Sequence, residues 1–184
     1  LPKHIGADRL IRVALTAIIT NPALLNCTTS SLIGCILQAA QLGLMPDGAV
    51  GEGYLIPFRN TKKNIMECQF IVGYRGLITL AYRSGQIISI QARAVYENDR
   101  FKYSFGLNED LEHIPASGSR GQITHVYAVI RMKNGGVIFD VMSKDDVEDI
   151  RRMSKNPNGS VWVQHYDEMA IKTVIRKISK RTPL

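Results

Sequence analysis

Residues 159–181 read GSVWVQHYDEMAIKTVIRKISKR, and we take this stretch as the element around which the chain is organised. Its side chains recur at helical spacing on two apolar faces. The first face carries Trp162, Tyr166, Met169 or Ala170, and Thr173, and the second carries Ile171, Val174, Ile175 and Ile178. Ser160 can cap the start and Pro183 follows the end, so the sequence predicts one helix with a wide core-facing side.

Positive side chains form a third row along this helix. Lys172, Arg176 and Lys180 repeat every four residues, and Glu168 lies one turn earlier. A rise of ~1.5 Å per residue separates neighbouring cations by ~6 Å, which is near the phosphate repeat of a nucleic-acid strand. The row therefore indicates contact with a polynucleotide backbone. The alternative is a solvated face on which Glu168 pairs with Lys172.

Composition narrows the class of partner. The 184 residues suit one domain with its own core, and no internal repeat or boundary is evident, so we predict a single domain over residues 1–184. Lys and Arg number 23 against 16 Asp and Glu, which gives a formal net charge of +7. Such a charge favours a polyanionic partner, as in ribosomal, membrane-surface and DNA-binding proteins.

Cysteine usage and hydropathy indicate a cytoplasmic protein without a membrane segment. Cys27, Cys35 and Cys68 lack metal-type spacing, and their apolar neighbours fit reduced, buried thiols. No apolar run approaches the ~20 residues that span a bilayer, and we see no signal peptide. The sequence starts without Met and stops just after a helix, so we expect a core whose tails are missing.

Signals for catalysis are weak throughout the sequence. The four histidines stand far apart, and none has the partner spacing of a zinc site. No nucleophile elbow or nucleotide-binding signature occurs. Asp145, Asp146, Glu148 and Asp149 cluster, but they open a predicted helix, where acids interact favourably with the helix dipole. We therefore expect no catalytic residue, no metal site and no enzyme activity.

The remaining elements alternate between helices and strands. Before residue 85 we expect helices at 8–20 and 28–42, strands at 54–58 and 65–72, and a short helix at 73–84. After it we expect strands at 87–97 and 101–105, a loop at 108–121, a hairpin formed by 122–133 and 137–142, and a helix at 143–154.

A glycine-rich turn precedes the short helix. Residues 73–77 read GYRGL, and glycines at a helix N-terminus permit a close backbone approach while the free N–H groups favour an anion. The turn is thus a second candidate phosphate contact. The alternative is that Gly73 and Gly76 only make a tight strand-to-helix connection.

Several motifs in fixed order resemble one known family. They are NPALL at 21–25, QAAQLGL at 38–44, YLIPF at 54–58, GYRGL at 73–77, RSGQI at 83–87, THVYAV at 124–129, and EMA at 168–170 with KT at 172–173. Together they cover nearly the whole chain. The sequence resembles the RecT family of phage and prophage recombination proteins.

This resemblance implies ATP-independent binding of single-stranded DNA and annealing of complementary strands in homologous recombination. It implies a ring or helical homo-oligomer, an annealed duplex intermediate and a phage exonuclease partner in the bacterial cytoplasm. A host single-strand-binding protein would be contacted through the C-terminal tail that this sequence lacks. No cofactor is required, and Mg²⁺ has only the role of a counterion to the DNA.

The implied fold is α+β, with an antiparallel β-β-β-α core of the annealing-protein type, two N-terminal helices and an additional β-hairpin. We assign the core to the strand at 87–97, the hairpin at 122–142 and the helix after Ser160. Two departures from the family pattern stand out. Ile171 replaces the first of two usual lysines, which makes Lys172 the better candidate, and Glu52 places an acid in the loop before Tyr54.

The predicted DNA-binding residues combine these observations. The last helix and the 73–76 turn would line one groove, with the strand held by its phosphates and its bases free to pair. The candidates are Lys172, Arg176, Lys180, Arg75, Tyr74, Gly76, Arg93, Lys102, Arg152 and Trp162. Trp162 is included for base stacking, although a core position is the alternative for it.

Two other functions remain open at this point. One is a metal-dependent nuclease that uses Asp145, Asp146 and Glu148, and the other is a passive coat on single strands that blocks pairing. Magnesium-dependent cutting would indicate the nuclease, and slowed duplex formation would indicate the coat.

Overall fold

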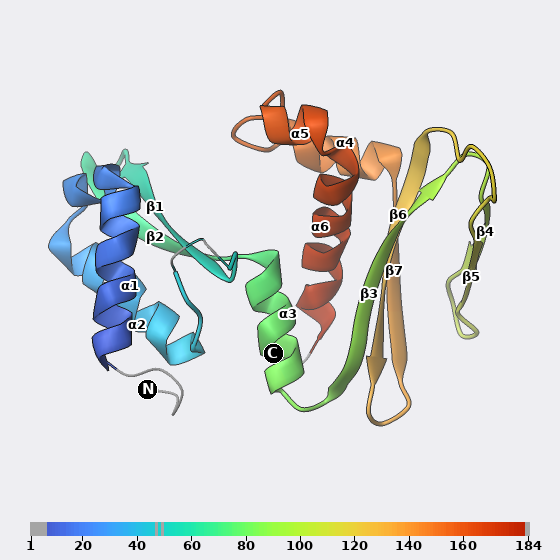
Figure 1. Cartoon of the computed structure of the whole chain (residues 1–184), viewed down its shortest axis with the longest axis horizontal. Coiled ribbons are helices and arrows are strands. Elements are labelled where there is room, and N and C mark those ends of the chain that lie inside the picture. Colours follow the sequence, from blue (N-terminus) through green and yellow to red (C-terminus); the bar gives the residue numbers. More distant parts are fainter. Residues whose placement is uncertain (1–6, 47, 49, 183–184) are drawn as a thin grey trace. The chain divides into compact units, whose positions relative to one another are not determined.

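The computed structural model describes residues 7–46, 48 and 50–182, and it has the predicted α+β class (Figure 1). Residues up to Arg83 form one compact unit, and those from Ser84 onward form a second. The single domain expected over residues 1–184 stays a prediction. In the described part of the chain, no helix combines the length and apolar character that crossing a bilayer requires.

The first unit begins with helices at nearly the predicted positions. They are α1 (Ala7–Thr20), the 3₁₀ turn η1 (Pro22–Asn26) and α2 (Thr29–Leu42). Thr28 occupies the N-cap of α2, and Gly43 follows it with φ 65°, a left-handed conformation that glycine adopts without strain. Arg83 donates to the carbonyls of Leu42 and Gly43 at 3.0 and 2.9 Å, so it satisfies acceptors that a helix end leaves open.

A two-stranded antiparallel sheet completes the first unit, together with a short helix. Strands β1 (Gly53–Asn60) and β2 (Ile65–Val72) pair along their full length, and α3 (Tyr74–Arg83) follows. Helix α2 packs on β2, and the three cysteines meet in their shared core. All three are free and buried, as the sequence predicted. Burial raises the pKa of Cys68 to about 12, so its thiol stays protonated.

The second unit is built on a three-stranded antiparallel sheet. Its order is β3 (Ile87–Tyr96), β6 (Ile123–Met132) and β7 (Val137–Ser143). The register places Ala92, Ala128 and Asp140 in one row across the sheet. Helix α6 (Tyr166–Ile178) packs on this face of all three strands (Figure 1). The strands and the helix are those that the sequence assigned to the core.

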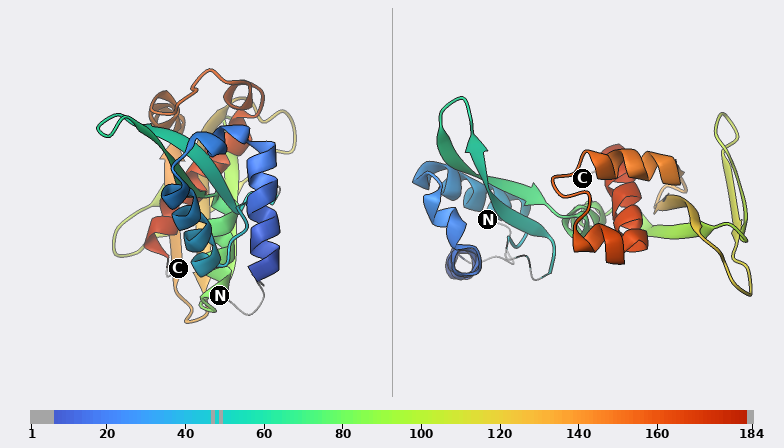
Figure 2. Two further views of the ribbon diagram at one scale, coloured as in Figure 1. Left: turned by 90° about the vertical axis from the view of Figure 1, so that its left-hand side faces the viewer. Right: turned by 90° about the horizontal axis from the view of Figure 1, so that it is seen from above.

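A hairpin of which the sequence predicted only the first strand covers the opposite face of this sheet. Strand β4 (Arg100–Ser104) confirms the strand expected at 101–105, and it pairs with β5 (Asp110–Ile114), which lies inside the stretch expected to be a loop (Figures 1 and 2). Phe101 and Leu111 pack against a buried cluster formed by Val95, Tyr127, Phe139 and Val141. The sequence DLEHI has few apolar residues, so its strand character depends on pairing with β4.

The stretch at 159–181 is not one helix, which corrects that expectation. It forms α5 (Ser160–Gln164), α6 and the 3₁₀ turn η2 (Ser179–Arg181), with a break at His165, where φ is −130° and ψ is 49°. Gly159, not Ser160, occupies the N-cap. The rings of Trp162 and Tyr166 remain 6.1 Å apart across the break, with Trp162 buried and Tyr166 half-buried. Pro183 lies outside the described residues.

Helix α4 (Lys144–Arg152) starts as the sequence predicted. Ser143 Oγ accepts from the Asp146 amide at 3.1 Å, and the Asp146 carboxylate accepts from the Ser143 amide at 2.8 Å, which completes a capping box. These bonds from Ser143 lower the pKa of Asp146.

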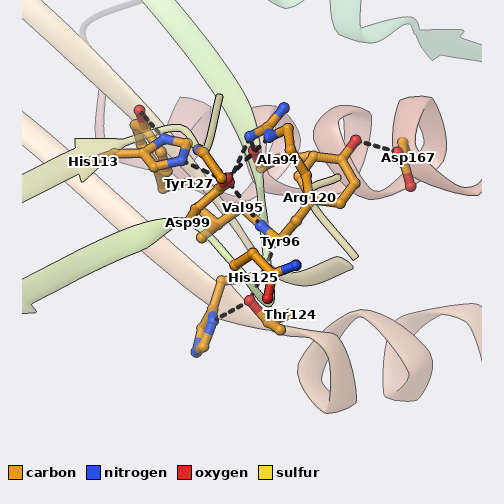
Figure 3. Close-up of polar contacts among 12 residues, drawn as sticks. Ala94, Val95, Tyr96, Asp99, His113, Arg120, Thr124, His125, Tyr127 and Asp167 are labelled. Carbon is orange, nitrogen blue, oxygen red and sulfur yellow. Dashed lines mark hydrogen bonds and ion pairs between the residues drawn. The ribbon is translucent and has the colours of Figure 1, made fainter. Parts of the chain in front are cut away.

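A buried carboxylate fastens the hairpin to the sheet (Figure 3). Asp99 has no exposed side-chain surface and receives Arg120 at 2.5 and 3.0 Å, His113 at 3.0 Å, and the amides of Tyr96 and Ala116 at 3.0 and 2.9 Å. The Arg120 bonds are the largest cause of the lowered pKa of Asp99. One side chain therefore joins β3, β5 and the loop before β6.

The same network continues to α6. The Arg120 guanidinium lies 4.1 Å from the centre of the Tyr96 ring, and the Tyr96 hydroxyl donates to Asp167 in the first turn of α6 (Figure 3). That bond and burial raise the pKa of Tyr96 to about 12. The hairpin on one face of the sheet is thus connected to the helix on the other.

Candidate nucleic-acid interface

The α6 row, which consists of Lys172 and Arg176 on α6 and Lys180 on the following turn η2, faces away from the sheet. Ala170, Val174 and Ile178 have no exposed surface, and at ~100° per residue their side of the helix lies opposite Arg176. Arg176 and Lys180 are exposed, and Lys172 is half-buried. The sheet contacts therefore fix the helix so that its positive side is presented outward, as the sequence predicted.

Lys177 at the end of α6 and Arg181 in η2 are two further cations of this region, and the sequence did not single them out. Lys177 Nζ lies 2.9 Å from Asp140 Oδ1, and Arg181 lies 3.8 Å from Asp140 Oδ2. Asp140 is buried on the face of β7 that α6 covers. A single acid inside the apolar run VIFDVMS was the available signal, since a buried carboxylate requires a positive partner.

Arg93 and Lys102 lie on the other side of the sheet from the α6 row. Arg93 stands opposite Tyr127 in the register, and Tyr127 in turn stands opposite Val141, so Arg93 belongs to the face that the hairpin covers. Lys102 is exposed on β4, between Phe101 and Tyr103, whose rings contact Tyr127 and His125 of β6. Within this unit neither residue joins the α6 row, and DNA contact by either stays a prediction.

Arg152 lies on α4 and Trp162 on α5 (Ser160–Gln164), and both have contacts of their own. Arg152 forms an ion pair with Asp149 on the surface of α4. Trp162 is 6% exposed, and the Arg151 guanidinium lies 5.8 Å from its ring centre. This burial favours the core position for Trp162 and leaves little of its ring for stacking on a base.

The glycine turn is occupied by the protein's own backbone. A Cβ at Gly73 would lie 2.1 Å from the Gly51 carbonyl oxygen, and one at Gly76 would lie 2.1 Å from that of Glu52. The Gly73 amide also donates to the Glu52 carbonyl at 2.8 Å. The close approach that these glycines permit is therefore made by the loop before β1. This supports the structural alternative for Gly76, which we expected to contact DNA.

Tyr74 and Arg75 still present polar groups at the start of α3. Arg75 is exposed, its Nε lies 3.3 Å from the Tyr74 hydroxyl, and its Nη1 donates to the Val50 carbonyl at 3.4 Å. The Glu52 carboxylate is used internally, because it accepts from Thr79 at 3.0 Å and from the Met45 amide at 3.3 Å. Arg75 thus remains a candidate. It belongs to the first unit and Lys172 to the second, so a groove shared by them stays a prediction.

The acidic candidates for a nuclease site have a structural use. Asp146 completes the capping box of α4 with Ser143. Arg151 lies 3.3 Å from Glu148 and donates to the Pro157 carbonyl at 2.7 Å. Among residues 7–46, 48 and 50–182, no group of three or more His, Cys, Asp or Glu side chains has the geometry to hold a metal ion.

Comparisons with known proteins agree with the motifs. The model of the RecT family matches residues 8–184. Protein RecT of Escherichia coli (strain K12) is 48% identical over 186 residues, which cover 100% of this chain and 69% of that protein. The uncharacterized protein YqaK of Bacillus subtilis (strain 168) is 29% identical over 149 residues, 80% of this chain and 49% of that protein. The chain belongs to the RecT family.

Proposed function

We propose that this chain binds single-stranded DNA and anneals complementary strands in recombination, without ATP. Membership of the RecT family supports a role in recombination or annealing. The observation that carries the proposal is the outward row of Lys172 and Arg176 on α6, which Lys180 continues on η2, while the other side of α6 is buried.

The proposed mechanism separates positioning from recognition. Cations of α6 hold the sugar–phosphate backbone, so the protein reads no sequence, and the exposed bases test a second strand by Watson–Crick pairing. Each neutralised phosphate contributes a slope of about −0.7 to the dependence of log K on log salt. Three contacts from this row give a slope of about −2. Binding by one protomer is then weak at physiological salt.

Assembly supplies the missing affinity in this proposal. Protomers in a ring or helical filament hold one strand at many points, and avidity multiplies their separate affinities. The proposed partners are single-stranded DNA, the annealed duplex, further copies of the chain, a phage exonuclease and a host single-strand-binding protein. The mechanism uses no cofactor, and Mg²⁺ serves only as a counterion to the DNA.

Annealing of two complementary labelled oligonucleotides tests the proposal. The parent chain should accelerate duplex formation without ATP, and Lys172→Ala with Arg176→Ala should reduce both binding and annealing. The matched control is Lys62→Ala with Lys133→Ala, which removes the same charge from exposed turns of the chain. The control should retain most of the annealing rate.

Other outcomes assign other functions. Slower duplex formation with the parent chain indicates a passive coat. If the parent chain shortens the labelled strands in the presence of Mg²⁺ and Asp146→Ala does not, the function is that of a nuclease. Equal loss in the α6 variant and its charge-matched control would mean that the row acts only through net charge.

A further inference from the structure

Asp140 is an acid in an apolar setting. On the α6-covered face of β7 its neighbours are Ile138 and Met142, and across the sheet it stands opposite Ala128. Its side chain is 4% exposed. A carboxylate at this place is costly, because burial removes its hydration.

The contacts of Asp140 do not satisfy it completely. Lys177 meets Oδ1 at 2.9 Å, while Arg181 stays at 3.8 Å from Oδ2, which has no hydrogen-bond partner among the described residues. A buried ion pair stabilises a fold only when the geometry is good and both oxygens are bonded. An apolar side chain would fill the position at lower cost, so stability alone does not explain Asp140.

The two cations, in contrast, keep much of their surface in solvent. The Lys177 and Arg181 side chains are 44% and 59% exposed, and both are anchored at one end of α6. Long cationic side chains lose rotamer freedom when they bind a phosphate. A carboxylate that already restrains them removes part of this entropic cost.

We propose that Lys177 and Arg181 form a second phosphate-binding site for the DNA backbone and that Asp140 is its positioning residue. Lys177 lies ~100° around α6 from Arg176, so this site adjoins the Lys172–Arg176–Lys180 row and widens the cationic surface of the helix. Lys177, Arg181 and Asp140 together carry a net charge of +1, which can interact with a DNA phosphate. The inference rests on the proposed binding of single-stranded DNA.

Asp140→Asn gives a test in which charge and positioning predict opposite signs. The variant gains one positive unit of net charge, so a purely electrostatic effect tightens DNA binding. If Asp140 positions the cations, the variant binds about 3- to 10-fold more weakly, because Lys177 and Arg181 are ordered only on binding. The measurement is fluorescence anisotropy of a labelled oligonucleotide, with folding checked by circular dichroism.

A second variant contains no buried charge and keeps the test decisive if Asp140→Asn folds poorly. Asp140→Asn with Lys177→Gln and Arg181→Gln lowers the net charge by one unit, as does the control Lys133→Gln. The triple variant should lose about 0.7 from the magnitude of the salt slope, because the net charge of +1 at this site neutralises one phosphate. The control should keep the parent slope.

The outcomes separate this inference from the function on which it rests. A parent chain that does not bind single-stranded DNA refutes the proposed function and this site with it. A parent chain that binds normally, while Asp140→Asn binds equally or more tightly and the triple variant keeps the parent slope, refutes the second site alone.

Discussion

Two buried carboxylates in the second unit differ in how completely they are satisfied. Asp99 receives Arg120, His113 and two backbone amides, all within 3.0 Å. Asp140 has one lysine at 2.9 Å, a distant arginine, and an oxygen without a hydrogen bond among the described residues. Both lie beside cations, but only Asp99 is fully enclosed by donors.

The difference indicates different roles. A saturated carboxylate joins segments, since every donor it binds comes from another part of the chain, and Asp99 joins β3, β5 and the loop before β6. An incompletely satisfied carboxylate contributes less to stability. Asp140 restrains cations that remain exposed, which is useful for binding an anion.

The largest expected effect is the loss of the Asp99 interactions. Asp99→Ala leaves His113 and two backbone amides buried without their acceptor, and we expect a loss of about 3–5 kcal/mol in the free energy of unfolding. Urea denaturation at neutral pH measures it. Asp110→Ala, which removes an exposed acid from the neighbouring hairpin, should change stability by less than about 0.5 kcal/mol. Equal losses of stability in the two variants would show that Asp99 contributes no more to the fold than an exposed acid does.

Acid should weaken the same link. The pKa of Asp99 is lowered in the folded chain, chiefly by Arg120, so the unfolded chain binds the proton more readily. The stabilisation is complete above the unfolded value of about 3.9 and is lost as pH falls below it. Denaturation at a series of pH values should show a steep acid decline that is shallower in Asp99→Asn. If stability declined in parallel in the parent chain and in Asp99→Asn, the acid sensitivity would come from other titratable groups.

Most of the fold was predictable because its signals are local. Gly43 ends α2 in the left-handed conformation, Ser143 and Asp146 cap α4, and residues 134–136 turn the hairpin between β6 and β7. Strand β5 was missed because its sequence, DLEHI, lacks the alternation of apolar and polar residues that predicts a strand. It is a strand because it pairs with β4, which the sequence does not show. The break at His165 was missed because apolar spacing continues across it.

The candidate site was predictable only in part, for a related reason. Spacing along one helix identified Lys172, Arg176 and Lys180, because these residues share a face whatever the tertiary structure. Whether Arg93 joins them depends on which face of the sheet α6 covers, and the sequence does not state this. Lys177 and Arg181 are explained by Asp140, more than 35 residues earlier, so only the folded chain connects them.

A smaller loss of stability is expected when the hydrogen bond between Tyr96 and Asp167, which connects the Asp99 network to α6, is removed. Tyr96→Phe keeps the ring that Arg120 covers but removes the hydroxyl that donates to Asp167, and we expect a loss of about 1–2 kcal/mol. Chemical denaturation measures the loss, and Tyr103→Phe on the exposed hairpin is the matched control. If Tyr96→Phe left the free energy of unfolding unchanged, the hairpin network would not be coupled to α6 through this bond.

The smallest stability effect is expected at Asp140, and it completes the contrast with Asp99. Asp140→Asn removes a charge that was never fully bonded, and the released Lys177 and Arg181 can be hydrated because both are already exposed. The free energy of unfolding should therefore change by no more than about 1 kcal/mol, against the several expected at Asp99. Urea denaturation of the two Asn variants side by side makes the comparison. If Asp140→Asn were as destabilising as Asp99→Asn, Asp140 would be a structural link like Asp99, and weaker DNA binding by that variant would no longer indicate a positioning role.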